Sequence, residues 1–464
     1  MAPDQEPDQK IAHDLDHTDR VVAWRDGRAI SRSGLLRDAA KLAHDMPNGR
    51  RIANSCSDQY HFLVVFLAAL MRGQTVILPH AFDTHILAEL AGGYPGLLFV
   101  TDRPRHTEPL DELTVAFDGT SDWLEPDFPD PKPDAPVASV FSSGSTGRPV
   151  PTHRTWKWMT TGVEHYAAAF GLDRMAAYNM VATVPSQHAF GLETAVFLTL
   201  CHRAAINTTI PLYPADVVAA LEQIPSPRVL VTTPVHLRVL VESRVTTPDV
   251  SLVLSATAPL QTSLAGEAEA MLGAPVMEVY GCTEIGLIAT RRTVDGEAWT
   301  LPHGMHLRAS GHGMRIDAAH LSEPVMLADG FQRLSDTTVE FKGRRNDIVK
   351  VAGKRASLSG LDAALNSIDG VIDGVYLPPS GGDAPANQRL TACVVIGDGD
   401  VDRIRRALRA KVASTFVPRP LIPVARIPRN GTGKVRYAEL RALAQSTAQP
   451  AAQASAQPAP EPGE

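Results

Sequence analysis

The sequence lacks a surplus of basic residues. Its 464 residues include 44 lysines and arginines against 51 aspartates and glutamates, which gives a formal net charge of −7. Proteins that bind nucleic acid usually carry a positive surplus that offsets the phosphate charge. The charge therefore argues against a general nucleic-acid-binding function.

Cysteine and long apolar runs are also scarce. The four cysteines have no CxxC spacing, which indicates reduced thiols and argues against a disulfide framework or a zinc site. The first ten residues, MAPDQEPDQK, lack an apolar signal core. The longest apolar run, Phe62 to Met71, is shorter than the roughly 20 residues that span a bilayer. We therefore expect a cytoplasmic protein without a membrane span. The cysteines are Cys56, Cys201, Cys282 and Cys393.

Short apolar segments alternate with helical patterns up to residue 280. This alternation predicts a largely parallel sheet covered by helices, with a ligand crevice at the carboxyl ends of its strands. The expected strands are Thr75–Leu78, Leu97–Val100, Val137–Phe141, Met180–Val184, Val229–Val231, Leu252–Ser255 and Val276–Tyr280, and the expected helices are Gln59–Arg72, Arg154–Phe170, Val217–Gln223 and Leu260–Leu272.

The pattern changes in the last third of the chain. Short Gly- and His-containing segments over 299–341 predict a small β subdomain. After Gly343, helix, strand, strand, helix and strand patterns follow one another. We expect an α/β fold with a large N-terminal domain of helix-covered, mostly parallel sheets over 1–343 and a small α+β C-terminal domain over 344–445. The Ala-, Gln- and Pro-rich tail over 446–464 is expected to be disordered. The C-terminal elements are expected at Gly360–Ser367, Val371–Tyr376, Arg389–Val395, Asp402–Ser414 and Ile422–Arg426.

A Gly- and Ser-rich loop directly follows the expected strand Val137–Phe141. Its glycines permit a tight backbone path, and its hydroxyl and amide groups are suited to hold phosphate oxygens. The Gly-Lys-Ser/Thr ending of P-loop NTPases is missing, which argues against a plain ATPase or kinase. A polar surface loop is the alternative, but the position after a buried strand favours phosphate binding. The loop reads Ser142-Ser143-Gly144-Ser145-Thr146-Gly147-Arg148-Pro149.

This loop and three later motifs resemble, in order, those of the acyl-adenylate-forming (ANL) superfamily, which includes acyl-CoA synthetases, peptide-synthetase adenylation domains and luciferases. The segment Tyr280-Gly281-Cys282-Thr283-Glu284 resembles the YGxTE element. Gly343 to Gly353 resembles the GRxxDxIKxxG hinge, and Asn430 to Lys434 resembles the NGxGK element. The compact length also resembles short bacterial ligases of aryl-polyene (xanthomonadin-like) pigment clusters. The resemblance covers nearly the whole chain.

The resemblance implies a role for each motif in binding ATP and Mg²⁺. Thr283 is expected to contact the α-phosphate, and Glu284 to hold the metal ion. Lys434 is expected to bridge the attacking carboxylate and the phosphate, although a lysine in a turn can also be merely solvated. Such positive charge is needed because two anions meet in the reaction. The hinge implies a mobile C-terminal domain in which Lys350 serves the second half-reaction.

Two further groups of residues are expected to bind substrate. Asp336 is expected to accept hydrogen bonds from the ribose and Arg344 to donate to it, although Ser-Asp is also a common turn sequence. His188 resembles the acyl-pocket histidine, with a structural histidine as the alternative. The adenine and acyl-pocket loop is expected at Ser255-Ala256-Thr257, next to Tyr280 and Gly281.

The sequence departs from the family pattern at two positions. Val150 stands where the family's phosphate loop has lysine, so Arg148 or Arg154 is a candidate substitute. Asn346 occupies the hinge position that is often Asp or Lys. Both positions leave the strength of phosphate binding and the hinge motion open.

The expected reaction is the ATP-dependent conversion of a carboxylic acid to an acyl adenylate, with release of pyrophosphate. An aryl acid such as hydroxybenzoate is favoured, and the acyl group would then pass to CoA or to the phosphopantetheine thiol of a carrier protein. The basic segment 403–441 favours an acidic acyl carrier protein as partner. The alternatives are a fatty acyl-CoA or acyl-AMP ligase and a non-catalytic adenylate-binding protein. The oligomeric state is not predicted.

Overall fold

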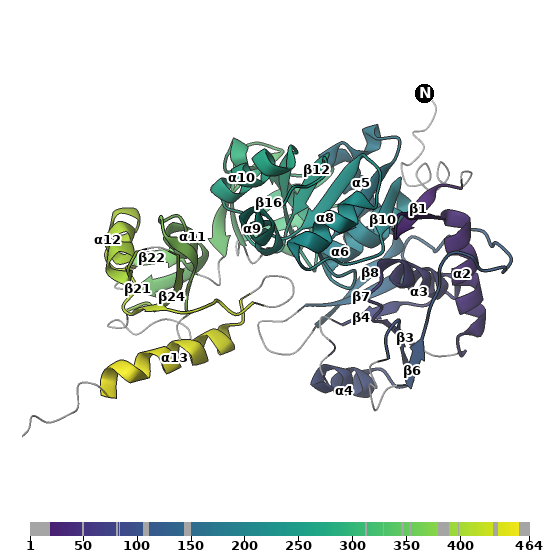
Figure 1. Ribbon diagram of the computed structural model, residues 1–464, viewed down its shortest axis with the longest axis horizontal. Helices are drawn as coiled ribbons and strands as arrows, with labels where there is room; N and C mark the ends of the chain where they lie inside the picture. The colour runs from purple at the N-terminus through teal and green to yellow at the C-terminus, as the bar shows by residue number, and fades with distance from the viewer. Residues whose placement is uncertain are drawn as a thin grey trace, which may run out of the picture. The chain divides into compact units, whose positions relative to one another are not determined.

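The computed structural model divides into two compact units. The first comprises residues 1–306 and 317–325, and the second residues 307–316 and 326–464. Figure 1 shows the elements of both units. The structure describes residues 19–48, 51–79, 82, 84–104, 111–142, 150–310, 313–327, 329–344, 348–351, 354–378, 389–397, 399–429 and 435–453.

The smaller sheet of the first unit has the strand order β6-β5-β3-β4-β7-β8. Its strands pair in parallel except for β7 and β8, which pair antiparallel. Because β4 and β5 lie on opposite sides of β3, the chain reverses its direction of winding at β3. The strands are β3 (Arg51–Asn54), β4 (Val76–Leu78), β5 (Leu97–Thr101), β6 (Asp111–Thr114), β7 (Pro136–Ser142) and β8 (Val150–Thr155).

The larger sheet contributes nine strands to the first unit, in the order β15-β14-β13-β12-β11-β9-β10-β1-β2. The run from β13 to β1 pairs in parallel, and β14 and β2 pair antiparallel at either end. The carboxyl ends of the parallel strands therefore share one edge. The strands are β1 (Val21–Arg25), β2 (Arg28–Ser31), β9 (Tyr178–Ala182), β10 (Ala204–Asn207), β11 (Arg228–Thr232), β12 (Leu252–Ser255), β13 (Val276–Cys282), β14 (Gly286–Arg292) and β15 (Ala298–Thr300).

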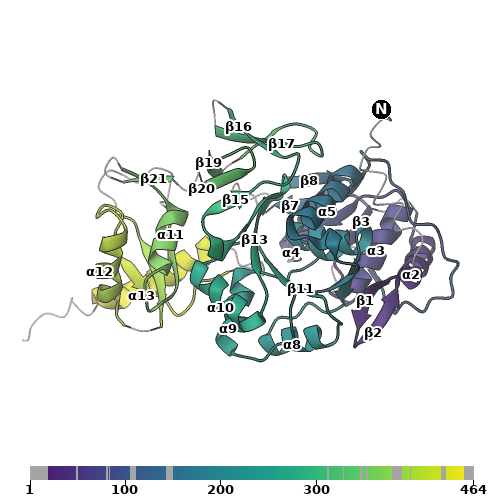
Figure 2. The same cartoon turned by 90° about the horizontal axis from the view of Figure 1, so that it is seen from above.

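Helices cover both faces of the larger sheet, because successive side chains of its central strands are buried on opposite sides. On β11, Val229 and Val231 pack into the main core with α3 and α5, whereas Leu230 packs against α8, α9 and α10. Figure 2 shows these last three helices together on one face. Helix α4 covers the smaller sheet. The helices are α2 (Arg32–Asp45), α3 (Gln59–Met71), α4 (Thr84–Gly93), α5 (Trp156–Phe170), α6 (Ala189–Gly191), η2 (Leu192–Phe197), α7 (Leu198–Cys201), α8 (Pro214–Glu222), α9 (Pro234–Ser243) and α10 (Thr262–Leu272), with 3₁₀ turns η1 (Leu172–Arg174) and η3 (Thr293–Asp295).

The second unit is a smaller α+β assembly with its own core. Helices α11 and α12 and the sheet β23-β24-β25 enclose residues such as Leu365, Tyr376 and Leu408. Short antiparallel strands precede them along the chain. The elements are β16 (His306–Ser310), β17 (Gly313–Asp317), β18 (Val325–Met326), β19 (Asp329–Arg333), β20 (Thr338–Arg344), β21 (Ile348–Val351), β22 (Lys354–Ser357), α11 (Leu358–Asn366), β23 (Val371–Tyr376), β24 (Ala392–Ile396), α12 (Val401–Lys411), β25 (Leu421–Pro423) and α13 (Tyr437–Gln453).

The predicted α/β fold class is confirmed, many expected element boundaries differ by a few residues, and two of the differences have a clear physical cause. The helix expected from Arg154 begins at Trp156, because Arg154 and Thr155 end strand β8 and Thr155 caps the helix. Helix α13 continues over 446–453, where a disordered tail was expected. Alanine and glutamine are good helix formers, which accounts for this extension. Within the described ranges, no helix combines the length and apolarity needed to cross a membrane.

Candidate active site

The motif residues of the first unit meet at the carboxyl edge of the larger sheet. Register pairs Thr232 with Ser255 and Ser255 with Glu278, so β11 and β12 end side by side and β13 continues beyond them to Cys282. The Ser255-Ala256-Thr257 loop and the Tyr280–Glu284 turn are therefore neighbours. The structure brings together two motifs that are about 25 residues apart in the chain.

The turn that carries Thr283 and Glu284 is tight because it is built on two glycines. A Cβ at Gly281 would lie 2.5 Å from the carbonyl oxygen of Gly286. Gly286 has a φ of +86°, and a Cβ there would lie 2.6 Å from the Trp158 ring. Neither position accepts a larger residue without a shift of the backbone or the ring. The turn leaves Thr283 half-buried and Glu284 exposed.

Glu284 is suited to hold a magnesium ion. Mg²⁺ prefers oxygen ligands and usually binds through one or two carboxylates together with substrate phosphates and water. The residues that the structure describes contain no group of three or more His, Cys, Asp or Glu side chains able to hold a metal ion. A single exposed carboxylate that shares the ion with a nucleotide fits this mode of binding.

Cys282 lies inside this turn and was not among the expected site residues. Burial raises the pKa of its thiol to about 12, and the charge of Glu284 and a hydrogen bond to it act in the same direction. The thiol thus stays protonated at neutral pH. In the sequence, the position of Cys282 inside the YGxTE element was the feature that could have pointed to it.

Arg154 does not replace the missing phosphate-loop lysine, which corrects one expectation from the sequence. Its side chain is fully buried. The guanidinium donates from Nη1 to Glu193 Oε1 at 2.7 Å and from Nη2 to the Thr283 carbonyl at 2.9 Å. It also lies 3.7 Å from the centre of the Trp158 ring. With both terminal nitrogens engaged in the interior, Arg154 is not available to a phosphate.

The loop after β12 combines small residues with backbone strain. Ser255 and Ala256 are buried, and the hydroxyl of Ser255 has no hydrogen-bond partner within the described ranges. Thr257 has a φ of +81°, which is rare for a β-branched residue. Strain of this kind is often retained at functional sites. The loop is thus suited to let a ligand approach the backbone closely.

His188 lies beyond the carboxyl end of β9, half-buried at the N-terminus of α6. The helix continues as the π-helix η2, a form that is frequent at functional sites. A Cβ at Gly191 would lie 2.1 Å from the Pro185 carbonyl oxygen, so glycine is needed where the helix passes the loop. The structure places His188 at the same edge of the sheet as the other two motifs.

A polar cluster that the sequence analysis missed lies at this edge. His236 Nδ1 lies 3.2 Å from the hydroxyl of Thr183 and 3.0 Å from that of Thr233. Thr183 also contacts the hydroxyl of Thr232 at 3.0 Å. Burial lowers the pKa of His236, so the ring is neutral at pH 7. The signal in the sequence was the polar Thr-Thr pair that ends a buried strand.

The expected site residues of the second unit lie on hairpins. Asp336 is exposed in the turn between β19 and β20, where it pairs with Arg333. Arg344 ends β20 opposite Asp329, and Lys350 lies in β21 opposite Arg355. Ser142 ends β7 in the first unit. The expected residues outside the described ranges are Ser143, Gly144, Ser145, Thr146, Gly147, Arg148, Asn346, Gly353 and Lys434.

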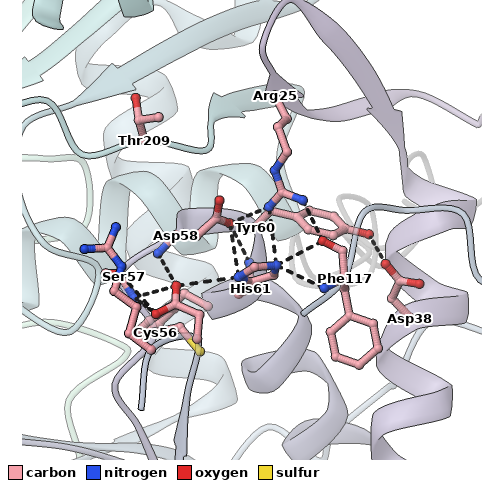
Figure 3. Close-up of polar contacts among 12 residues, drawn as sticks. Arg25, Asp38, Cys56, Ser57, Asp58, Tyr60, His61, Phe117 and Thr209 are labelled. Atoms are coloured by element: carbon pink, nitrogen blue, oxygen red, sulfur yellow. Dashed lines mark hydrogen bonds and ion pairs between the residues drawn. The ribbon is translucent and has the colours of Figure 1, made fainter. Parts of the chain in front are cut away.

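A second polar cluster lies at the carboxyl ends of β3 and β5 in the smaller sheet (Figure 3). Asp102 accepts from the amides of Ser57 and Asp58, at the N-terminus of α3. His61 lies 3.5 Å from the same carboxylate through Nδ1, and 2.9 Å from the Phe117 carbonyl through Nε2. Since a protein carboxylate already occupies the helix N-terminus, we assign this cluster a stabilising role.

The charges of the Asp102 cluster support one another. Burial alone would raise the pKa of Asp102, but contacts with His61 and the Ser57 and Asp58 amides hold it well below its usual range. Burial alone would lower the pKa of His61, but the contacts with Asp102 and Asp58 outweigh burial, and the pKa of His61 is raised. Arg25 pairs with Asp58 at 2.8 Å.

Comparisons with known proteins agree with this arrangement. A family model described as an AMP-binding enzyme matches residues 16–311. The chain is 29% identical to a 4-coumarate–CoA ligase of Halorhodospira halophila over 303 residues, covering 64% of this chain and 74% of that protein. It is 21% identical to a 3,4-dihydroxybenzoate–[aryl-carrier protein] ligase of Bacillus anthracis over 351 residues, covering 73% and 83%.

The fold is also found in a solved structure with a bound reaction intermediate. The o-succinylbenzoate CoA synthetase (MenE) of Bacillus subtilis, in complex with the acyl-adenylate intermediate OSB-AMP, superposes with a TM-score of 0.77 at 16% identity. The alignment covers 93% of this chain and 96% of that chain. It supports the same fold along nearly the full length.

Proposed function

The chain belongs to the AMP-binding enzyme family, and on that premise we propose that it activates a hydroxylated aryl acid, such as a hydroxybenzoate, and transfers it to a thiol. Adenylation of a carboxylic acid is the activity that the family relatives have in common. The two relatives named above carry hydroxylated aryl acids in their names, coumarate and 3,4-dihydroxybenzoate. Pigment biosynthesis is the process we propose for the product, on the basis of the compact chain length.

The observation that carries the choice of acid is the polar lining of the sheet edge. Thr183, Thr233 and His236 form one hydrogen-bonded cluster, and the Ser255 hydroxyl is buried nearby at the end of β12. A substrate hydroxyl can exchange hydrogen bonds with such groups. An alkyl chain would leave the buried Ser255 hydroxyl, which has no partner within the described ranges, still unsatisfied, at a cost of roughly 1–3 kcal/mol. The edge therefore favours a hydroxylated acid over a fatty acid.

In the adenylating step, a carboxylate oxygen of the substrate bonds to the α-phosphorus of ATP, and the bond to the pyrophosphate leaving group breaks. Thr283 would donate its hydroxyl to the α-phosphate, and Lys434 would balance the charge of the two approaching anions. Bound magnesium, held by Glu284, supplies positive charge at the phosphates. Asp336 and Arg344 would hold the ribose.

In the second step, a thiol attacks the acyl carbonyl and AMP leaves. We assign Lys350 to this step and propose a domain boundary at residue 343, with residues 344–445 moving as the C-terminal domain. His188 would lie beside the reacting carboxyl group.

The acceptor we propose is an acidic carrier protein. Helix α12 exposes Arg403, Arg406, Arg409 and Lys411 along one stretch of the second unit. A basic surface of this kind attracts an acidic partner and increases the rate of association. CoA is the alternative acceptor, and both present the same phosphopantetheine thiol.

Carboxylate-dependent ATP–pyrophosphate exchange tests the proposed substrate. We expect exchange with 3- or 4-hydroxybenzoate and little with octanoate or palmitate. His236→Leu should raise the KM for the hydroxylated acid at least tenfold and leave the KM for ATP unchanged. Preference for the fatty acids would support a fatty acyl ligase instead. If protein that binds ATP shows no exchange with any acid, the replacement of the phosphate-loop lysine by Val150 would account for the missing catalysis. That result would support a non-catalytic adenylate-binding protein.

A further inference from the structure

We propose that Arg154 is a positioning residue that holds the magnesium-binding turn in register with strand β8 and the acyl-pocket helix. The proposal rests on the nucleotide-binding function proposed above. It concerns residues of the first unit only.

Arg154 contacts segments that are far apart in the sequence. It belongs to β8, the strand that leaves the phosphate loop at Val150. Its ion-pair partner, Glu193, lies on the π-helix five residues after His188. Its second hydrogen bond reaches the carbonyl of Thr283, next to Glu284. One side chain thus connects strand β8, the π-helix after His188 and the turn that carries Glu284.

Stability alone does not explain this arrangement. The side chains of Arg154 and Glu193 are 0% and 5% exposed. Burying an ion pair of this kind is often no better for stability than a well-packed apolar pair. Within the described ranges, the Nε–H of Arg154 has no hydrogen-bond partner, so the guanidinium is not fully satisfied. The geometry instead favours a role for the hydrogen bond to the Thr283 carbonyl, which fixes the turn relative to the π-helix.

The partners of Arg154 are themselves held in place. Trp158 packs between the guanidinium and Gly286, where no Cβ would fit. Tyr166 contributes a hydrogen bond to Glu193; burial raises the pKa of its hydroxyl, and Glu193 raises it further. The Glu193 carboxylate therefore accepts from two donors, which orient it.

A second hold on the same turn comes from His320. Its Nε2 lies 3.3 Å from the Ile285 carbonyl, and its ring stands edge-on to Trp158 at 5.6 Å. Burial lowers the pKa of His320 to about 4, so the neutral ring donates to that carbonyl at pH 7. The carbonyls on either side of Glu284 are thus both fixed from the protein interior, which leaves the carboxylate free to face solvent and ligand.

Two variants test the proposal. Arg154→Lys keeps the charge beside Glu193, but its single amino group cannot make the forked contact with Thr283. The double variant Arg154→Met/Glu193→Leu replaces the ion pair with an apolar pair of similar size. We expect each to weaken magnesium-dependent ATP binding by roughly 10- to 100-fold, as for residues that orient metal ligands. ATP binding measured in EDTA should change little.

The measurement is isothermal titration of the full chain with ATP, with and without magnesium. The matched control is Arg291→Lys, which alters another buried ion pair and ring contact, with Glu278 and Trp299, on the same β13–β14 hairpin but away from the turn. It should keep the wild-type magnesium dependence. Folded Arg154 variants that bind MgATP as tightly as wild type would overturn the positioning role. A wild type without magnesium-dependent ATP binding would instead refute the proposed function.

Discussion

Thr257 has a backbone conformation that few β-branched residues adopt, at the point where β12 meets the candidate site. The structure retains this strain although glycine would relieve it. We interpret it as the consequence of placing a hydroxyl and a methyl group next to the ligand. Sequence reasoning predicted the loop from its small residues but could not predict the strain, because φ depends on how the strand ends are joined.

Replacing Thr257 should separate stability from binding. Thr257→Gly removes the strain, so we expect the free energy of unfolding to rise by up to about 1 kcal/mol. The lost side chain should raise the KM for the acid. Urea unfolding and exchange kinetics measure the two effects. A fall in stability would show that Thr257 makes contacts worth more than its strain.

The Asp102 cluster predicts a pH-dependent contribution to stability. Because the folded pKa of Asp102 is depressed, its contribution is fully present above the unfolded pKa of about 3.9 and is lost as the pH falls toward the folded value. Asp102→Asn should therefore lower the free energy of unfolding by about 1–3 kcal/mol at pH 7. The difference from wild type should shrink below about pH 4. Equal differences at pH 7 and pH 3 in urea titrations would contradict this assignment.

At the scale of the element, buried strands were the most predictable feature. The bounds expected for β12 and β23 agree with the structure, because both strands are short apolar runs with clear ends. Strand β8 was missed because VPTHRT has no apolar alternation and pairs only through β7. The Arg154–Glu193 pair was also missed, since nothing in a sequence relates two residues 39 positions apart.

The π-helix that follows His188 depends on one glycine. Gly191→Ala would place a methyl group against the Pro185 carbonyl, so the helix must shift. We expect a loss of about 1–3 kcal/mol in stability and a higher KM for the acid. Gly162→Ala on α5 is the control, because its Cβ would meet nothing within 4 Å. It should stabilise the protein by about 0.5–1 kcal/mol. Similar Tm changes for both variants would show that the π-helix does not require glycine at position 191.

At the scale of the whole molecule, charge is unevenly distributed. The chain is acidic, yet α12 exposes four basic side chains. The motifs supplied the candidate site residues through their resemblance to a family, whereas the acceptor depends on a surface whose partner no motif names. Composition limited the possible classes of function, whereas contacts such as the Arg154–Glu193 pair and the His236 cluster became visible only in the folded structure.

Reversing the charge of α12 tests the acceptor. Arg406→Glu/Arg409→Glu should raise the KM for an acidic carrier protein about tenfold at low salt, with a smaller effect at high salt. The KM for CoA should change less. Lys41→Glu, an exposed substitution on α2, is the control for a charge reversal elsewhere on the surface. Equal effects on both acceptors would argue against a carrier-specific surface.

The buried Arg154–Glu193 pair also constrains how the sequence can change over time. Loss of either residue alone leaves an uncompensated charge in the interior, a change that typically costs 3–5 kcal/mol. Such single substitutions should be rare intermediates between related chains. Positions 154 and 193 are therefore expected to covary among homologues, appearing either as the charged pair or as two apolar residues.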